Sequence, residues 1–219
     1  MKKLLIFGTS NYAEVMKCYF LEDSEYEVVA FVESATYIDK EELDGLPVVA
    51  FEEINRTHPP EDHEIYIAVG FSKLNAVRKL FYEESKKKGY KLASYINSGV
   101  KIWDNNILGD HVCIFEDNTI QPFAEIGSNT VLWCGNHIGH HTKIGDDCFI
   151  ASHIVLSGHS EIGESSFVGV NVTLRDDIKV GKSNILGAGA IILDNTKDYE
   201  VYPGSKTSPI SKLSYEIDF

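Results

Sequence analysis

Aliphatic residues recur at every sixth position through the second half of the chain. From Ile102 to Ile192, all sixteen positions at this spacing hold isoleucine, leucine or valine. A period of six fits neither an amphipathic helix nor the simple alternation of a strand. It is typical of a parallel β-helix, in which each short strand points one aliphatic side chain inward before the chain turns a corner. Three strands make a coil of roughly 18 residues, so the repeats predict about five coils stacked at the β spacing of about 4.8 Å.

Two further positions of the repeat favour small residues. Glycine often follows the aliphatic residue directly, as at Gly139 and Gly145, and we expect it to supply backbone conformations needed at the corners. The residue four places after the aliphatic one is usually small or short and polar, and we expect it to lean inward. These residues are Asn118, Ala124, Thr130, Asn136, Thr142, Cys148, Ser160, Ser166, Asn184 and Ala190.

The first 95 residues show strands alternating with helices. Short apolar runs predict strands at 3–7, 26–32, 46–49, 64–69 and 91–96, with helices through about residue 21 and from 72 to about 88. This βαβ rhythm is typical of an open parallel sheet. We therefore predict a Rossmann-like α/β domain over residues 1–95, followed by a parallel β-helix domain with a C-terminal cap over residues 96–219.

The carboxyl ends of the strands are the usual ligand site of such a sheet. The turn after the first strand meets a helix N-terminus, where backbone N–H groups favour a phosphate. Glu33 ends the second strand and is placed to accept hydrogen bonds from a sugar or ribose hydroxyl. The expected substrate-binding residues are Ser10, Asn11, Tyr12, Glu33, Ser34 and Gly70. The full glycine fingerprint is missing, so we exclude NAD, and a domain without any ligand is the alternative.

Charge and cysteine content narrow the choice of partners. The formal charge of −13 argues against nucleic acid or an anionic membrane as the main partner. No apolar run approaches the length of a membrane span, and nothing resembles a signal peptide. The four cysteines show no paired metal spacing. We therefore expect a protein of the reducing cytoplasm.

Histidines gather in the repeat stretch. His141, His153 and His159 each follow an inward aliphatic residue by three positions, so they are expected at equivalent corners. His141 and His159 lie 18 residues apart and are expected to stack on one corner. One coil after His140 stands Gly158, which leaves room for a thin ligand beside the imidazole. Imidazole can accept a proton at neutral pH, so His140 is either a general base or a solvated corner residue.

The chain resembles a family of sugar O- and N-acyltransferases in three features. These are the order of the two domains, the turn Gly8-Thr9-Ser10-Asn11-Tyr12-Ala13 and the segment Ile67-Ala68-Val69-Gly70. This family includes the bacillosamine-pathway acetyltransferase and sialic-acid O-acetyltransferases, whose first turn usually reads Gly-Ala-Ser-Gly-His-Gly. Ser10 matches that turn, whereas Asn11 and Tyr12 depart from it. The resemblance implies a left-handed β-helix, a homotrimer and direct acetyl transfer from acetyl-CoA to a nucleotide-linked amino sugar in glycan biosynthesis. The alternatives are O-acetylation of a sugar hydroxyl such as that of sialic acid, and a trimer that binds a sugar nucleotide without catalysis.

The resemblance also assigns catalytic residues. The family's general base corresponds to His140, and the acidic residue that usually follows it is replaced by His141. A neutral imidazole can orient His140 but stabilises its imidazolium less than a carboxylate does. Asp146, Asp147 or a carboxylate of a neighbouring subunit is the alternative partner.

Acetyl-CoA contacts follow from the same resemblance. They fall on Phe149, Val170 and Ala188, which are expected along one groove between neighbouring β-helices of the trimer. Gly158 is expected to offer a backbone N–H to the oxyanion of the tetrahedral intermediate.

Zinc sites of gamma-class carbonic anhydrases are the competing interpretation, but the spacing of His153 and His159 does not fit them, so no metal cofactor is expected. Residues 202–206 are expected to cap the open end of the β-helix.

Overall fold

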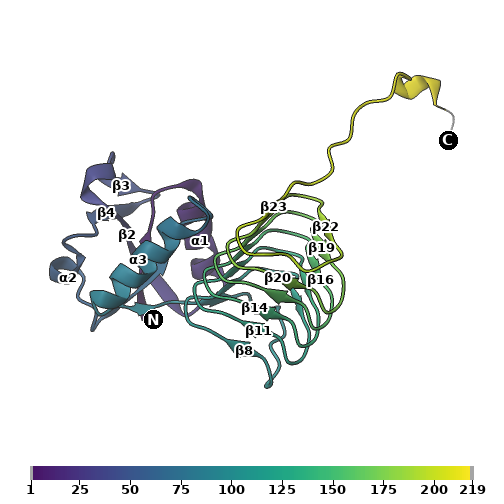
Figure 1. The fold of residues 1–219 in the computed structure, drawn as a ribbon. Helices are drawn as coiled ribbons and strands as arrows, with labels where there is room; N and C mark the ends of the chain where they lie inside the picture. The colour runs from purple at the N-terminus through teal and green to yellow at the C-terminus, as the bar shows by residue number, and fades with distance from the viewer. Residues whose placement is uncertain (1, 218–219) are drawn as a thin grey trace.

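The computed structural model describes residues 2–217 and places a small α/β domain beside a parallel β-helix (Figure 1). The sheet of the α/β domain has the order β3-β4-β2-β1-β5-β6, and only β3 runs antiparallel to its neighbour. Its elements are β1 (Lys2–Phe7), α1 (Asn11–Glu22), β2 (Tyr26–Glu33), η1 (Ala35–Tyr37), β3 (Glu42–Leu43), β4 (Leu46–Ala50), α2 (Ile54–Thr57), β5 (His63–Ile67), α3 (Ala76–Lys87) and β6 (Lys91–Leu92).

Alternate residues of β1 point to opposite faces of this sheet, as the pleat of a strand requires. Leu4 and Ile6 belong to a core that includes Met16 of α1 and continues into the β-helix. Leu5 and Phe7 belong to a second core on the other face, together with residues of α2 and α3. One face of the sheet is thus shared with the β-helix, which fixes how the two parts sit against each other.

The beginning of α3 differs from the sequence prediction. The helix was expected from residue 72 but begins at Ala76. Lys73, Leu74 and Asn75 have left-handed backbone conformations, with φ of 50°, 51° and 65°. This conformation is unfavourable for residues with a Cβ, so contacts must hold it. Asn75 is fully buried, and its side-chain amide donates to the backbone carbonyl of Ser166 in the β-helix.

The β-helix consists of two-residue strands that pair with the strand 18 residues away, as in Thr119↔His137 and His137↔Val155. The last strand is the exception and pairs at 16 residues, as in Ile185↔Val201. Its strands are β7 (Tyr95–Ile96), β8 (Ile107–Leu108), β9 (Cys113–Ile114), β10 (Thr119–Ile120), β11 (Glu125–Ile126), β12 (Val131–Leu132), β13 (His137–Ile138), β14 (Lys143–Ile144), β15 (Phe149–Ile150), β16 (Val155–Leu156), β17 (Glu161–Ile162), β18 (Phe167–Val168), β19 (Thr173–Leu174), β20 (Lys179–Val180), β21 (Ile185–Leu186), β22 (Ile191–Ile192) and β23 (Val201–Tyr202).

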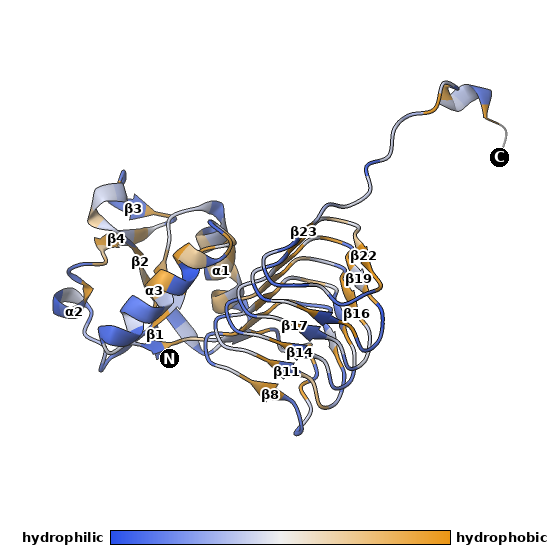
Figure 2. Cartoon of the chain, in the orientation of Figure 1, coloured by the Kyte–Doolittle hydropathy of each residue, from blue (hydrophilic) through white to orange (hydrophobic). Residues whose placement is uncertain are grey.

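These strands form three flat faces. The covered face is β7-β9-β12-β15-β18-β21-β23, and the α/β domain packs over part of it. The charged face is β8-β11-β14-β17-β20. The open face is β10-β13-β16-β19-β22, and Figure 2 shows hydrophobic segments at β19 and β22. Val155 and Ile191 on this face are 39% and 68% exposed.

The six-residue repeat builds the core as expected. Every repeat aliphatic from Ile114 to Ile192 is at most 3% exposed, and all ten small residues four places after an aliphatic are buried. Polar members of this set form hydrogen bonds inside the coil; for example, Thr130 Oγ1 donates to the carbonyl of Gly145 at 2.9 Å. The exception is Asn118 Oδ1, which is buried without a partner among the described residues.

The expected reason for the repeat glycines is wrong. None of the glycines that directly follow a repeat aliphatic has a positive φ, and the left-handed corner positions are taken by other residues such as His141 and Asp147. Glycine is needed because the next coil passes very close. A Cβ on Gly139 would lie 2.7 Å from the backbone nitrogen of Gly158, and one on Gly163 would lie 2.5 Å from that of Lys182.

The chain passes between the two parts within the segment expected as one strand at 91–96. β6 pairs with β5 of the α/β sheet, whereas β7 pairs with β9 of the covered face. The expected division into residues 1–95 and 96–219 stays a prediction.

The C-terminal segment closes the β-helix earlier than expected. The backbone N–H groups of Lys179 and Lys182 donate to the side chains of Asn195 and Asp198, and β23 pairs with β21. From residue 205 the chain runs outward to η2 (Ser214–Glu216) (Figure 1). No helix within residues 2–217 is long and apolar enough to cross a membrane.

Candidate active site

Three histidines meet at the corner between the open face and the charged face. His141 and His159 occupy the left-handed corner position on successive coils, with φ of 58° and 57°. Their rings stack at a centroid distance of 4.8 Å, and His141 also stacks on Phe123 at 4.6 Å. The predicted stacking of His141 and His159 is thus confirmed. His140 lies beside them, with its ring centroid 5.0 Å from that of His159.

The imidazole of His140 lies directly over Gly158. A Cβ added to Gly158 would come 2.6 Å from Cε1 and 2.8 Å from Nε2 of that ring. The space above the glycine is therefore taken by the imidazole itself, and only glycine permits this approach. The backbone of His140 is held on both sides, since its N–H donates to Gln121 Oε1 and its carbonyl accepts from the N–H of His159.

His140 and His141 are arranged so that one imidazole orients the other. Their Nδ1 atoms lie 3.3 Å apart. When His140 carries its proton on Nδ1 and donates it to His141, the Nε2 of His140 keeps a free lone pair. That tautomer makes Nε2 the atom that can accept a proton from a substrate. His141 is placed where its Nδ1 can accept this hydrogen bond.

Asp146 and Asp147, the two carboxylates considered as partners for His140, form hydrogen bonds and ion pairs with other residues of this chain. Asp146 accepts a hydrogen bond from the backbone N–H of Ser128. Asp147 is buried and pairs with Lys79 at 2.7 Å. Both lie at the corner between the charged and covered faces, so neither orients His140 within one chain.

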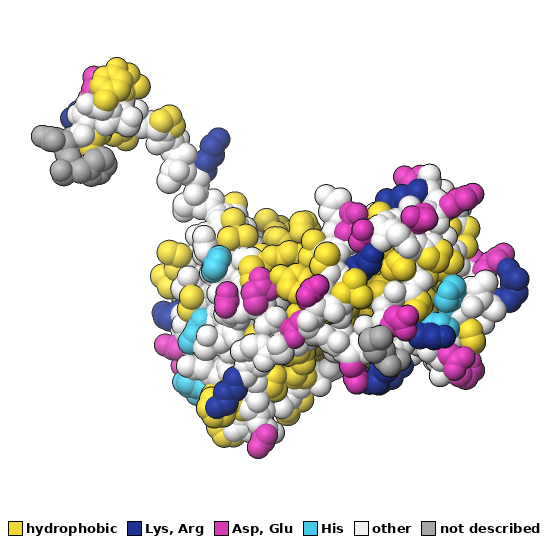
Figure 3. Space-filling model, turned by 180° about the vertical axis from the view of Figure 1, so that it is seen from behind, with side chains coloured by type: hydrophobic (Ala, Val, Ile, Leu, Met, Phe, Trp, Pro, Cys, Tyr) yellow, Lys and Arg dark blue, Asp and Glu magenta, His cyan; other side chains and the backbone are white. Residues whose placement is uncertain are grey.

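A cleft opens where the α/β domain meets the covered face. It has a volume of about 310 Å³ and is lined by Asn11, Tyr12, Val15, Gly70, Phe71, Trp133 and Phe149. Hydrophobic side chains gather at this junction on the face seen in Figure 3. Three of the predicted substrate residues thus share one cleft with Phe149, which was predicted to contact acetyl-CoA.

The other predicted substrate residues lie at the same strand ends without lining this cleft. Ser10 precedes α1 and is exposed, and its side chain makes no capping hydrogen bond. The carboxylate of Glu33 accepts hydrogen bonds from Thr9 Oγ1 at 3.2 Å and from the backbone N–H of Ser34 at 2.9 Å. Glu33 is half-buried, so it is partly available to a hydroxyl of a ligand.

A buried arginine joins the cleft to the β-helix. Arg78 of α3 is fully buried, and its guanidinium donates to the backbone carbonyls of Gly70, Asn129, Asp147 and Cys148. Burial lowers the pKa of Arg78 because the charged form loses its hydration. Since Gly70 lines the cleft and Cys148 precedes Phe149, this side chain sets the distance between the two walls of the cleft.

A second buried connection runs along the corner beside Arg78. The N–H of Ile67 donates to Nε2 of His111, so the ring's proton is on Nδ1, which donates to Asn129. Asn129 in turn donates to Asp147, which pairs with Lys79. Burial lowers the pKa of His111 to about 3, so this imidazole is neutral.

The residues predicted to hold acetyl-CoA do not share one groove within a single chain. Val170 and Ala188 are exposed and follow one another at the corner between the covered and open faces. Gly158 lies at the opposite edge of the open face, beside His140. Phe149 points outward from the covered face, where it is 7% exposed and packs on Phe71. The repeat puts these residues on different corners and faces of one chain, so the expected groove between neighbouring β-helices of a trimer stays a prediction.

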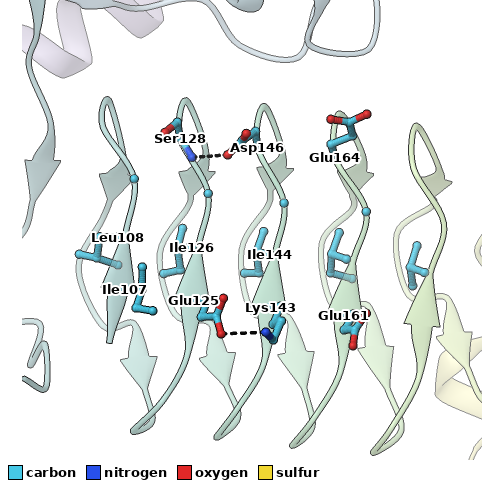
Figure 4. Close-up of a pocket in the computed structure, with 16 residues that line it drawn as sticks. Ile107, Leu108, Glu125, Ile126, Ser128, Lys143, Ile144, Asp146, Glu161 and Glu164 are labelled. Carbon is cyan, nitrogen blue, oxygen red and sulfur yellow. Dashed lines mark hydrogen bonds and ion pairs between the residues drawn. The ribbon is translucent and has the colours of Figure 1, made fainter. Parts of the chain in front are cut away.

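The charged face carries a shallow hollow of about 520 Å³. Figure 4 shows Glu125 paired with Lys143 across adjacent strands, and Asp146 bonded to the backbone of Ser128. Glu161 pairs with Lys179 one coil further on. The strand residues Glu125 and Glu161 are thus paired, and we assign no chemistry to this face.

Sequence reasoning missed two aromatic walls of the cleft, Phe71 and Trp133. A signal for Trp133 existed, since an aromatic residue stands there at the repeat position that glycine usually holds. The counterpart one coil earlier, Phe115, departs in the same way and is 1% exposed. Trp133 and Phe115 thus lie on the part of the β-helix that the α/β domain covers, although large residues at this position are not always covered, since Trp103 and Leu193 are exposed.

Comparison with known proteins agrees with this arrangement. Residues 3–85 match the model of the PglD N-terminal domain, and residues 123–158 match that of the bacterial transferase hexapeptide (six repeats). No curated protein matches the chain.

Solved structures share the whole fold. One is a variant of perosamine N-acetyltransferase from Caulobacter crescentus in complex with CoA and GDP-perosamine, with 19% identity, a TM-score of 0.81, and coverage of 92% of this chain and 93% of that one. The acetyltransferase domain of PglB from Neisseria gonorrhoeae has 22% identity and a TM-score of 0.80, and the match covers 96% of this chain and 100% of that one. WeeI from Acinetobacter baumannii has 18% identity and a TM-score of 0.77, and the match covers 92% of this chain and 96% of that one.

The predicted fold class, a Rossmann-like domain followed by a left-handed parallel β-helix, is confirmed by the element order, the sheet topology and these relatives. Residues 3–85 thus belong to the PglD N-terminal domain family and residues 123–158 to the bacterial transferase hexapeptide family, and their arrangement in one fold is shared with acetyltransferases of known structure.

Proposed function

We propose that this protein is an acetyl-CoA-dependent N-acetyltransferase acting on a nucleotide-linked amino sugar in glycan biosynthesis, with His140 as general base. The observation that carries the proposal is the placement of His140 over Gly158, with its Nδ1 against that of His141 on an exposed corner. The Caulobacter relative was solved with CoA and GDP-perosamine, which supports both substrate classes.

In the proposed reaction the sugar amine attacks the thioester carbonyl of acetyl-CoA. A C–N bond forms, and the tetrahedral intermediate then breaks its C–S bond and releases CoA as the thiolate. His140 Nε2 takes the proton that the amine loses, and the resulting imidazolium returns it to the thiolate. No nucleophilic side chain is required, because the amine attacks directly.

Gly158 has a second role in this proposal. Among residues 2–217, its N–H donates no hydrogen bond, although it lies beneath the ring of His140. A free N–H beside the base is suited to the oxyanion of the intermediate. Gly158 is therefore assigned to oxyanion stabilisation.

The active site is completed by a neighbouring subunit in this account. The covered face packs on the α/β domain and the charged face carries ion pairs, which leaves the open face, with Val155 and Ile191, for contact between copies. A three-fold axis beside the open face would bring the His140 corner of one subunit against the Val170 and Ala188 corner of the next. We infer a homotrimer in which acetyl-CoA lies between these two corners.

The nucleotide sugar is assigned to the α/β domain and the junction cleft. Tyr12, Phe71 and Trp133 offer aromatic surface to a base or sugar ring, while the N-terminus of α1 favours a phosphate. With a formal charge of −13, the chain relies on such local donors for an anionic ligand. Acetyl-CoA and sugar nucleotides are cytoplasmic metabolites, so the cytoplasm is the proposed location.

A thiol-release assay tests this function. Acetyl-CoA is incubated with UDP-, dTDP- and GDP-linked 3-amino and 4-amino sugars, using the native chain and His140→Ala. Turnover on an amino sugar that falls about a hundredfold or more in His140→Ala supports both the reaction and the base. Turnover only on sialic acid or another hydroxyl acceptor would replace the N-acetyl assignment with O-acetylation. Binding of a sugar nucleotide without any turnover would favour the non-catalytic alternative, which the replacement of the usual acidic residue by His141 keeps open.

A further inference from the structure

The three histidines of the corner also have the spacing of a metal-binding site. Each of His140, His141 and His159 offers a ring nitrogen, and these three atoms all lie within 4.8 Å of one another. The Nδ1 atoms of His140 and His141 are 3.3 Å apart. Two nitrogens bound to one zinc ion at about 2.05 Å with a tetrahedral angle are separated by about 3.3 Å, so this pair is already at the ligand spacing.

The third ligand is within easy reach. His159 is exposed, as are His140 and His141, so its ring can turn toward the pair without disturbing the core. In the structure its ring is parallel to that of His141, with an interplanar angle of 15°, and a rotation about the side-chain bonds aims a nitrogen at the shared position. An ion reached from solvent would keep a fourth position for water.

Two acidic residues and one basic residue, Arg175, stand on the next coil at this corner. Asp176 and Asp177 occupy the same corner on the next coil, where the N–H of Asp177 donates to the carbonyl of Gly158. The nearest lysine in sequence, Lys143, pairs with Glu125 at 2.9 Å, so its charge is balanced. The formal charge of −13 on the whole chain also attracts cations, at longer range.

We propose that a zinc ion, or another divalent ion that prefers imidazole, binds to His140, His141 and His159 and stops the proposed acyl transfer. Binding itself does not depend on the proposed function, whereas the inhibition rests on it. An ion on Nδ1 of His140 leaves the ring's proton on Nε2, so the atom assigned as general base has no lone pair. The ion therefore acts as an inhibitor and not as a cofactor.

Isothermal titration of the chelator-treated protein with zinc sulfate tests the binding. The native chain is expected to bind one ion per subunit, and His159→Ala is expected to weaken binding by about tenfold or more. His153→Ala is the matched control, because His153 has the same left-handed corner conformation (φ 57°) at a different corner. It is expected to bind as the native chain does.

The proposal is overturned if the native chain does not bind zinc, or if His159→Ala binds it as tightly as the native chain does. Cobalt in place of zinc gives a second readout, since tetrahedral imidazole ligation produces visible absorption that His159→Ala loses. These measurements need neither acetyl-CoA nor a sugar, so they decide the binding even if no acyl transfer is found.

The inhibition is measured in the thiol-release assay. The turnover of each protein with zinc is compared with its own turnover without zinc. Zinc is expected to stop the native enzyme at concentrations that leave the turnover of His159→Ala at its zinc-free level. Equal zinc sensitivity of the two would contradict the inhibition. Absence of turnover in the native chain would contradict the proposed function and its inhibition together, without changing the binding result.

Discussion

Arg78 of the α/β domain donates a hydrogen bond to the backbone carbonyl of Cys148 in the β-helix, at 3.0 Å across a fully buried junction. The guanidinium of Arg78 donates only to neutral oxygens, namely backbone carbonyls and the side-chain oxygen of Asn75. Asp147 accepts through its backbone carbonyl, because its carboxylate pairs with Lys79. A planar donor with five N–H groups can serve several carbonyls at once, which a lysine cannot do. Among residues 2–217, Arg78 therefore makes the largest set of hydrogen bonds across the junction, beside the contacts of Asn75 with Ser166 and of Lys79 with Asp147.

Arg78→Met is expected to lower the free energy of unfolding by about 3 kcal/mol or more, because it leaves several buried acceptors without donors. Urea unfolding followed by circular dichroism measures this loss. Arg56→Met is the matched control, since Arg56 is exposed and pairs only with Glu53, and it should change stability by less than about 0.5 kcal/mol. Equal stability of the two variants would contradict the role of Arg78.

His111 predicts a dependence of stability on acid. Its folded pKa of about 3 lies below the unfolded value near 6.5, so the unfolded chain takes up the proton first as pH falls. The contribution is fully present above pH 6.5 and is lost between about pH 6.5 and 3, at up to about 1.4 kcal/mol per pH unit.

Urea midpoints at several values between pH 7 and pH 5 measure this slope. His111→Gln can keep both hydrogen bonds without taking up a proton, so its slope is expected to be flatter than that of the native chain. His153→Gln serves as the control at an exposed corner and should retain the native slope. A native slope in His111→Gln would show that another group is responsible.

The pairing of His140 with His141 predicts the effect of removing the second imidazole. His141→Phe preserves stacking with Phe123 and His159 but removes the acceptor at Nδ1. We expect kcat to fall about tenfold or more with KM little changed, as for loss of a group that orients the base. His141→Asp restores a carboxylate and is expected to retain more activity than His141→Phe. The reverse order would exclude an orienting role for His141.

A bulky residue in the proposed acetyl-CoA groove should affect one substrate selectively. Ala188→Phe is expected to raise KM for acetyl-CoA about tenfold or more and to leave KM for the sugar nucleotide nearly unchanged. Glu164→Phe is the matched control, because Glu164 is exposed at the same position of the repeat on a different corner. Equal effects of the two variants, or a change confined to the sugar nucleotide, would rule out this location for acetyl-CoA.

The fold could be read from the sequence because a six-residue period admits few structures. The inward positions, the buried small residues and the stacking of His141 on His159 all follow from counting along the repeat. The purpose of the repeat glycines could not be read, because it depends on how closely the next coil approaches. The beginning of α3 was missed for a similar reason, since the left-handed residues before Ala76 are held by contacts of Asn75 with the distant Ser166.

The candidate site was predictable only in part. His140 and Gly158 could be paired because they are one coil apart, and the structure puts them in contact. The cleft around Tyr12, Phe71 and Trp133 depends on how the α/β domain packs on the covered face, which no local pattern encodes. The separation of Phe149 from Val170 likewise follows from the three faces of the coil and not from their distance in sequence.

Mixed trimers test most directly the claim that acyl transfer occurs between His140 of one subunit and the Ala188 corner of the next. His140→Ala and Ala188→Phe chains are purified, unfolded together in equal amounts and refolded, and turnover is compared with that of each variant alone. Random assembly gives every mixed trimer one interface with both native residues, so the mixture is expected to recover about one quarter of native turnover. Recovery to that level would support a site shared between subunits, whereas a mixture as inactive as the separate variants would contradict it.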